Sequence, residues 1–387
     1  MKKLATRLTF YSLWALGLVF ILFPVVVSFG IPDEIQISRE EFEQSQPLGV
    51  TYIRNLRQST THVSQVGEDD TRFIELKLFG KITVRRIKVD FFPHERVLAG
   101  GIPIGYTAET RGLIVTKGND EFDIKRGDVI ISVNGVDVNC PRELEKLVKP
   151  SAELVTKLLR KGKEITKTLT PQNGLGIFLK NETTGIGMLT YINPENNNFA
   201  ALGHMINDFE TGATVNIQSG KIYRTEIHSI EKSEGKRVGH FKSTLLKGKY
   251  PVQGHILSSN KTGVFGCLTV DSSVATGESV GITSRFNVKP GKAVLRTSLD
   301  GKTTEDFEIE IIKNRFQKTP DIKSLVVRIV DKRILNASGG IIHGMSGSPI
   351  LQDGKLVGAL THVMVDDVTK GYGIYIDFMQ PRADKSS

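Results

Sequence analysis

Short runs of apolar-biased residues, each followed by a cluster of turn-forming residues, repeat along the chain from about residue 175 to the end. The run 185–192 is followed by an Asn-rich turn at 193–198, and a second run covers 199–206. Many short strands at such spacing favour a barrel or a sandwich. The chain also contains 38 glycines, which fits frequent turns. The sequence therefore predicts a mainly β protein.

The length of 387 residues is enough for two domains with separate cores. The formal net charge is +9, and three of those charges stand in residues 2–7. The other basic residues mostly alternate with apolar ones, as in 81–89, so we expect solvated strand faces and no nucleic-acid surface. Neither Cys140 nor Cys267 belongs to a cluster with zinc spacing, and we expect no metal and no cofactor.

An uncharged apolar run extends from Phe10 to Phe29, directly after the basic start of the chain. A run of about 20 apolar residues can span the hydrocarbon layer as a helix. The basic start places the N-terminus in the cytoplasm and the rest across the membrane. We therefore expect a transmembrane anchor over 1–33 and a single-pass protein whose bulk lies outside the cytoplasm. A cleaved signal peptide is the alternative, but no A-x-A-like site follows.

The next segment, 34–96, is expected to join the anchor to the folded part of the chain. Residues 34–70 are rich in Glu, Gln, Ser and Thr and read as a polar juxtamembrane linker. Residues 73–91 alternate apolar and polar side chains, which is the period of half-buried strands.

Residues 97–172 have the pattern of a small separate domain. The segment opens on the glycine-rich run 100–105 and continues with a strand at 112–116. The pair Asn134-Gly135 then stands between two β-rich runs. This pair favours a hairpin with a type I′ turn, because that turn needs a positive φ at both central residues.

A helix is expected over 141–148, with Pro141 tolerated in its first turn, and strands return over 154–170. This order resembles a PDZ domain, and the Gly-Asp and Val-Asn-Gly parts of 124–138 carry the resemblance. PDZ domains bind a peptide as an added strand and hold its terminal carboxylate with backbone amides of a loop. The resemblance implies that Ile104-Gly105-Tyr106 is that peptide-binding loop, although Gly105 could simply permit a turn.

The segment Gly344-Met345-Ser346-Gly347-Ser348-Pro349 has the residues expected of a nucleophile loop. Serine attacks a carbonyl only if a base removes its proton and donors hold the developing oxyanion. Flanking glycines let the backbone turn tightly, so the Ser346 hydroxyl can project while the amides of Gly344 and Ser346 form an oxyanion hole. A glycine-serine turn that binds nothing is the alternative.

Asp353-Gly354 predicts a hairpin directly after the nucleophile loop. The arrangement resembles chymotrypsin-like peptidases, in which Gly-x-Ser-Gly-Gly-Pro precedes such a hairpin. Here Ser348 stands in place of the second glycine. The resemblance implies a chymotrypsin-like double β-barrel over residues 173–387.

The base should be a histidine, and we select His204 because it ends a predicted strand beside a glycine. A histidine at such a position can face a cleft between two sheets, although a satisfied core histidine is the alternative. The other candidates are His62, His94, His228, His240, His255, His343 and His362.

The third group should be a carboxylate that orients the imidazole. Asp331 follows the long apolar run 324–330, 15 residues before Ser346. An exposed residue at a strand end is the alternative interpretation, and Asp271 and Asp366 are the competing carboxylates.

Motifs from several parts of the chain together resemble the stage IV sporulation protein B peptidase family, whose members are membrane-anchored PDZ serine peptidases. The resemblance spans nearly the whole chain. Besides the N-terminal anchor, the matching motifs are Leu78-Phe79-Gly80-Lys81-Ile82, Gly100-Gly101, Gly185-Ile186-Gly187-Met188-Leu189-Thr190, Ala201-Leu202-Gly203-His204, 339–350, and Gly358-Ala359-Leu360-Thr361-His362-Val363. By the family's motifs, His204 is the general base, Asp331 the acid and Ser346 the nucleophile.

The resemblance also implies a biological role. Such a peptidase crosses the forespore membrane and faces the intermembrane space, where it cuts a membrane-bound regulator of an intramembrane metalloprotease. That cut triggers the activation of a late sporulation sigma factor. Family members also cleave themselves, which makes the N-terminal region a further substrate.

Two other readings of the sequence remain. The first is a non-catalytic, membrane-tethered PDZ scaffold in which Ser346 has no chemical role. The second is a stress-response peptidase with PDZ domains, but those place the peptidase before the PDZ domain, whereas this chain has the reverse order.

Overall fold

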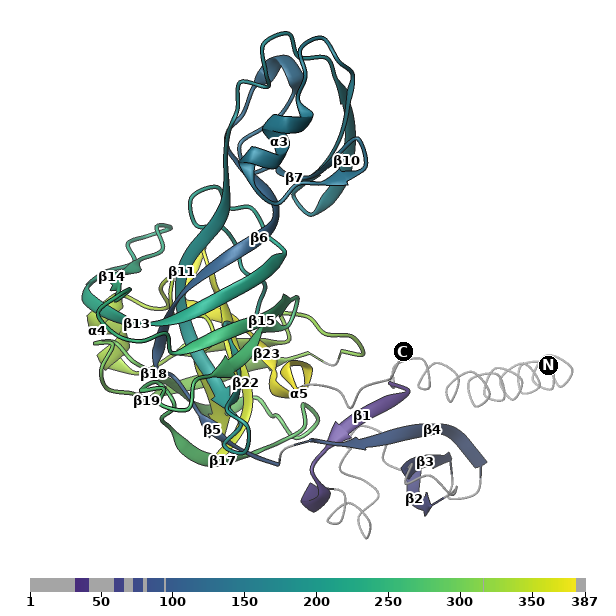
Figure 1. Cartoon of the computed structure of the whole chain (residues 1–387). Helices are drawn as coiled ribbons and strands as arrows, with labels where there is room; N and C mark the ends of the chain where they lie inside the picture. The colour runs from purple at the N-terminus through teal and green to yellow at the C-terminus, as the bar shows by residue number, and fades with distance from the viewer. Residues whose placement is uncertain are drawn as a thin grey trace, which may run out of the picture.

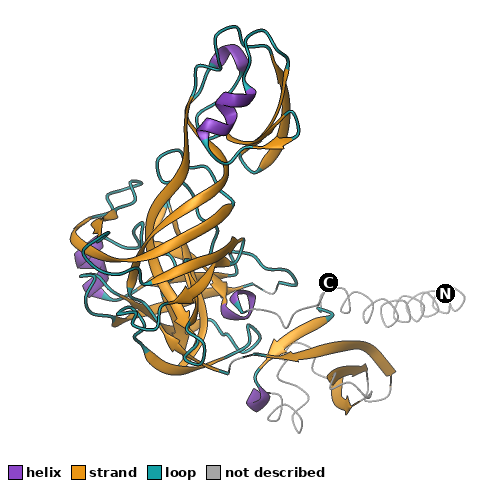
Figure 2. Cartoon of the chain, viewed as in Figure 1, coloured by secondary structure: helices purple, strands orange, loops and turns teal. Residues whose placement is uncertain are grey.

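The computed structural model describes residues 32–41, 59–65, 72–78, 82–93, 95–315 and 317–380, and strands make up most of it (Figure 2). The expected anchor, with its apolar run Phe10–Phe29, lies outside the described residues. Among the helices that are described, none is long and apolar enough to cross a membrane.

A small sheet precedes the larger body and lies beside it (Figure 1). Its strands, in the order β1-β4-β3-β2, are β1 (Glu34–Ile37), β4 (Ile82–Phe91), β3 (Arg72–Leu78) and β2 (Ser59–Gln65). The Glu41 carboxylate attaches this part to the larger body, because it accepts hydrogen bonds from Thr283 and from Asn287 Nδ2, the latter at 2.8 Å.

The larger body begins with a ring of six strands, each paired with the next and the last with the first. In ring order they are β6 (Pro103–Lys117), β11 (Phe178–Ile192), β12 (Asn198–Ala201), β16 (Gly263–Leu268), β15 (Gly254–Asn260) and β13 (Ile217–Glu231). Ile104, Leu189, Phe199 and Ile222 fill the ring and are nearly inaccessible to solvent. Strand β14 (His240–Leu245) extends the far end of β13 as a hairpin.

A second ring of six strands follows in the sequence. In ring order they are β22 (Lys355–Met364), β23 (Asp367–Tyr375), β20 (Leu325–Ile329), β19 (Glu305–Asn314), β18 (Gly291–Thr297) and β21 (Pro349–Gln352). Its core includes Leu295, Phe307, Val327 and Ile374. The helices α4 (Lys332–Ser338) and α5 (Ile376–Met379) follow β20 and β23.

Two short strands connect the rings. β5 (Arg96–Ala99) pairs with β11 of the first ring and with β17 (Glu278–Ile282), and β17 pairs with β22 of the second ring. The two rings are therefore joined by backbone hydrogen bonds as well as by side-chain packing.

The outer part of β6 leads into a small lobe, and β11 leads back (Figure 1). The lobe contains the short helix η2 (Asp120–Phe122), strands β7 (Val129–Val133) and β8 (Val136–Asp137), helix α3 (Pro141–Leu147), and strands β9 (Leu154–Arg160) and β10 (Lys163–Leu169). It has its own core, which includes Leu113, Ile130, Leu144 and Leu154. The predicted turn is confirmed, since Asn134 and Gly135 have φ of 52° and 78° between β7 and β8.

The lobe begins later in the chain than the sequence boundary at residue 97 suggested. Strand β5 and residues 104–110 of β6 pair with strands of the larger body, and the core of the lobe starts at Leu113. One continuous strand of 15 residues serves both parts, so no break in the sequence marks the boundary.

Candidate active site

Ser346 lies in the loop between α4 and β21, and this loop, 339–348, is attached to both rings. From the first ring, the Met188 amide donates to the Ser346 carbonyl at 2.8 Å, and the Thr190 hydroxyl donates to the Gly347 carbonyl at 2.8 Å. From the second ring, the Leu360 carbonyl accepts from the Gly347 amide at 2.7 Å. The backbone around the serine is thus fixed from two sides.

Gly347 and Ser348 explain why the loop needs small residues. Gly347 has φ of 96°, and a Cβ there would lie 2.2 Å from the Met188 carbonyl oxygen. Ser348 is fully buried, and its hydroxyl lies 2.7 Å from the Met345 carbonyl and 2.9 Å from the Thr297 hydroxyl. The serine that replaces the second glycine of the chymotrypsin-like pattern therefore braces the loop.

His204 follows β12 of the first ring after a sharp turn in which Leu202 and Gly203 have φ of 67° and 72°. Its Nδ1 lies 2.7 Å from the Met205 carbonyl oxygen. Because a carbonyl can only accept, Nδ1 must carry the proton, and the lone pair of the neutral imidazole is then on Nε2. The Met205 carbonyl thus orients a histidine that can act as a base.

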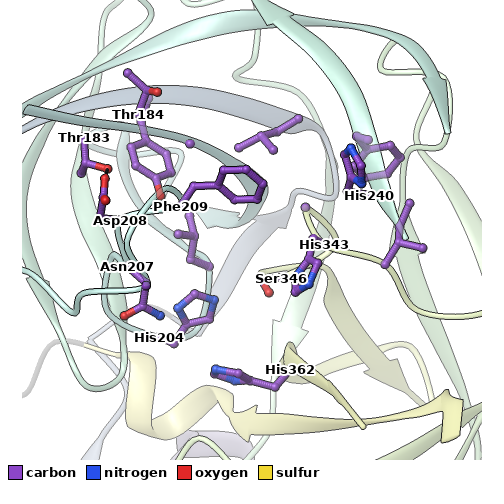
Figure 3. Close-up of a pocket in the computed structure, with 18 of the residues that line it drawn as sticks. Thr183, Thr184, His204, Asn207, Asp208, Phe209, His240, His343, Ser346 and His362 are labelled. Atoms are coloured by element: carbon purple, nitrogen blue, oxygen red, sulfur yellow. Dashed lines mark hydrogen bonds between the residues drawn. The ribbon is translucent and has the colours of Figure 1, made fainter. Parts of the chain in front are cut away.

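Ser346 and His204 line the same cavity, which has a volume of about 920 Å³. Figure 3 shows Ser346 surrounded by His204, His343 and His362. The rings of His204 and His362 have centroids 4.8 Å apart. The Ser346 hydroxyl donates to the Thr361 carbonyl at 2.7 Å, and within the described residues no hydrogen bond joins it to His204.

Burial favours the neutral state of the three histidines around Ser346. Burial lowers the pKa of His204 and outweighs the bond to the Met205 carbonyl, which acts in the opposite direction. Burial, with the nearby His204, lowers the pKa of His362 to about 4. Burial and the nearby His240 lower the pKa of His343. At neutral pH, His204 is therefore present in the form that a general base requires.

The two amides predicted to form the oxyanion hole are not used elsewhere. Within the described part of the chain, neither the Gly344 amide nor the Ser346 amide donates a hydrogen bond. The neighbouring amides of Met345 and Gly347 are bonded to the Ile342 and Leu360 carbonyls. Gly344 and Ser346 both line the cavity, so their amides are free donors beside the serine hydroxyl.

The structure does not bring Asp331 to the histidine, and this corrects the expectation from the sequence. Asp331 caps the N-terminus of α4, where its carboxylate accepts from the Arg333 amide at 2.8 Å and from the Arg333 guanidinium at 2.8 Å. The Glu308 amide also donates to it. The Arg333 guanidinium is the main reason that the pKa of Asp331 is lowered to about 2. From its position before Ser346 alone, an aspartate that caps a helix cannot be told from a catalytic aspartate.

The competing carboxylates are not partners of His204 either. Asp271 and Asp366 are exposed. Asp208 also lines the cavity. It is not among the carboxylates that the sequence indicated, although it stands four residues after His204. Its oxygens are bonded to Lys180, Thr183 and Thr211. These bonds outweigh burial and hold the pKa of Asp208 below its ordinary value.

The proposed peptide-binding loop, Ile104-Gly105-Tyr106, is also corrected. These residues lie near the start of β6, which pairs there with β11 on one side and with β13 on the other. Ile104 and Tyr106 are buried. With strands on both sides, this segment has no free backbone edge for a peptide.

The structure shows no competing metal centre in the part of the chain that it describes, where no group of three or more His, Cys, Asp or Glu side chains could hold an ion. What the cavity offers is a serine, a neutral oriented histidine and free amides on a mainly β scaffold. Those are the groups of a hydrolase that works through a serine nucleophile.

The profile of the SpoIVB peptidase S55 family matches residues 172–380, which is more than half of the chain. The chain belongs to this family of serine peptidases. No curated protein matches the sequence. Among solved structures, the active form of the Rv3671c protease from M. tuberculosis is similar with a TM-score of 0.31 and 12% identity, over 50% of this chain and 70% of that one. A likeness at this level carries no conclusion about the activity of this chain.

Proposed function

We propose that this chain is a serine endopeptidase in which Ser346 is the nucleophile, His204 the general base, and the amides of Gly344 and Ser346 the oxyanion hole. The main support is that Ser346 and His204 come from different rings and line one cavity. The family assignment favours this enzyme over a non-catalytic scaffold.

The proposed reaction begins when the Ser346 hydroxyl turns from the Thr361 carbonyl toward Nε2 of His204. His204 takes the proton as Oγ bonds to the scissile carbonyl carbon, and the oxyanion accepts from the two free amides. The imidazolium then gives its proton to the leaving amine, and water repeats the sequence to release the acyl group. The Met205 carbonyl keeps the proton on Nδ1 throughout. Catalytic hydrogen bonds are often loose before the substrate binds.

The direct test is to treat the purified protein with a fluorophosphonate probe and to identify the modified residue by mass spectrometry. Modification of Ser346 supports the proposal. A folded, processed protein that is not modified at Ser346 would contradict it.

The pH dependence should report on His204. Because the pKa of this histidine is lowered, its neutral form persists below the ordinary value of 6.5. We expect the labelling rate to fall on the acid side with a midpoint below 6.5, since activity needs the neutral form. The measurement is the labelling rate against pH. His255→Asn, which changes an exposed histidine outside the cavity, should leave the midpoint in place, and a midpoint above 6.5 would contradict the assignment.

We also propose that the two rings are the barrels of a chymotrypsin-like double β-barrel and that the small lobe is a PDZ-like domain. The closed pairing of each set of six strands and the position of the cavity between them support the first. The separate core and the order of β7, β8, α3, β9 and β10 support the second. The family match over 172–380 supports a peptidase part over 173–387, to which the preceding segment adds the strands β5 and β6.

The remaining proposals concern the setting of the enzyme and rest on the sequence. The apolar run Phe10–Phe29 supports a single-pass membrane anchor with the peptidase outside the cytoplasm. By its family, the chain would cut a membrane-bound regulator of an intramembrane metalloprotease, and also itself, to trigger sporulation signalling at the forespore membrane. Mass spectrometry of the mature N-terminus tests two of these points together, because it reports the removal of the anchor and any self-cleavage site.

A further inference from the structure

The hairpin of β13 and β14 lies against the nucleophile loop at the residue before Gly344. The His343 amide donates to the Gly239 carbonyl at 2.8 Å, and the Phe241 amide donates to the His343 carbonyl at 3.4 Å. His343 therefore adds to the outer edge of β14 like one residue of a parallel strand.

This contact fixes the direction of the Gly344 amide. In a trans peptide, the carbonyl and the following N–H point in opposite directions. The His343 carbonyl points at the Phe241 amide of β14, so the Gly344 N–H must point away from β14. That N–H is one of the two free donors of the candidate oxyanion hole.

Side chains of the hairpin reinforce the same contact. A Cβ on Gly344 would lie 2.5 Å from Cδ2 of Phe241, so the Phe241 ring covers the backbone of Gly344. Ser233, near the hairpin tip, accepts from the Gly239 amide at 2.9 Å and donates through Oγ to the Ile341 carbonyl at 3.4 Å. The Ser233 amide also donates to the Ser338 carbonyl at 2.9 Å.

We infer that the β13–β14 hairpin is a positioning element of the catalytic site, in which Phe241 and Ser233 hold the His343–Gly344 peptide so that its N–H serves the oxyanion. The inference rests on the proposed function, because it concerns the oxyanion hole of the same serine. Phe241 and Ser233 act through this peptide and do not touch the reacting atoms.

The central variant is Phe241→Pro, which removes the amide that holds the His343 carbonyl. This amide points to the outer edge of β14, so the change removes no hydrogen bond between β13 and β14. Loss of one oxyanion donor lowers kcat by about 10²- to 10³-fold. We expect a loss of about that size in the rate of fluorophosphonate labelling and in kcat for p-nitrophenyl acetate, with KM little changed. Phe241→Ala keeps the amide and should lose less.

A second variant keeps the test valid if Phe241→Pro does not fold. Ser233→Ala removes two hydrogen bonds without changing the backbone, and a loss of about 5- to 30-fold is expected. Ser233→Thr, which keeps a hydroxyl, should recover most of the rate. The matched control is Ser229→Ala, an exposed serine on the same hairpin, which should behave as the wild type.

The outcomes separate the positioning role from a structural one. The inference is supported if kcat falls, KM and the thermal unfolding midpoint stay near those of the wild type, and Ser233→Thr restores the rate. It is overturned if folded Phe241→Pro or Ser233→Ala is labelled as fast as the wild type. If the wild type itself is not labelled at Ser346, the proposed function fails and this inference fails with it. If the wild type and a folded variant, Phe241→Pro or Ser233→Ala, are labelled equally fast, only the inference is overturned.

Discussion

Ser346→Ala is expected to lower the rate of peptide-bond cleavage by roughly a millionfold, and His204→Ala should cost nearly as much. The reason is that attack needs the serine oxygen and a base that takes its proton in the same step. The double variant should lose little more than either single variant, because each change already disables the same step. The rates can be followed by fluorophosphonate labelling for His204→Ala and by self-cleavage for all three.

His343→Ala and His362→Ala test whether the general base is His204 or one of its neighbours, because all three histidines line the same cavity. If His204→Ala kept its activity while His343→Ala or His362→Ala lost it, the base would be misassigned. Asp331→Asn is informative in another way, because asparagine still offers a capping oxygen. Unchanged labelling fits the capping position, whereas a loss as large as that of His204→Ala would require the carboxylate to reach the histidine.

Arg285→Met should be the most damaging change for stability. Arg285 and Asp377 form a buried ion pair at 2.5 Å, and the Asp377 side chain is fully covered. Removing one partner of such a pair leaves an uncompensated buried charge, which costs about 3–5 kcal/mol. We expect a large fall in the thermal unfolding midpoint, measured by circular dichroism.

The pH dependence and a double variant test the cause. Burial already raises the pKa of Asp377, and loss of the arginine should raise it further. A carboxyl with a raised pKa in the folded state favours folding at low pH and disfavours it as the pH rises through that pKa. The defect of Arg285→Met should therefore be smaller at acidic pH than at neutral pH. Arg285→Met with Asp377→Leu should recover much of the stability, and a double variant as unstable as the single one would contradict this explanation.

Features encoded by neighbouring residues could be predicted from the sequence. Asn134-Gly135 and Asp353-Gly354 both adopt positive φ between paired strands, as their residue types require. The helix expected over 141–148 is confirmed as α3. The segment 344–349 turns at Gly344 and Gly347, which both have positive φ, as its residue types predict, because turn chemistry is local.

Features that depend on long-range pairing could not be predicted. Residues 103–105 of the glycine-rich run begin a strand that lies between two others, and only the partners β11 and β13 decide this. The position of Asp331 shortly before Ser346 in the sequence predicts the acid of the triad, whereas its carboxylate in fact accepts hydrogen bonds from Arg333. The contact between β14 and His343 joins segments about a hundred residues apart, and no local pattern reports it.

The small lobe is attached to the larger body by paired strands. β6 and β11 are each 15 residues long and run side by side from the first ring into the lobe. The pairing shifts register between Lys180 and Glu182, close to Gly112, whose φ is 92°. An irregularity of this kind bends the strand locally. The lobe is therefore joined to the larger body through this strand pair, and the same β11 carries Met188 and Thr190, which hydrogen-bond to the loop of Ser346. A force applied to the lobe would therefore be transmitted along β11 to this loop, because a strand and not a flexible linker connects them.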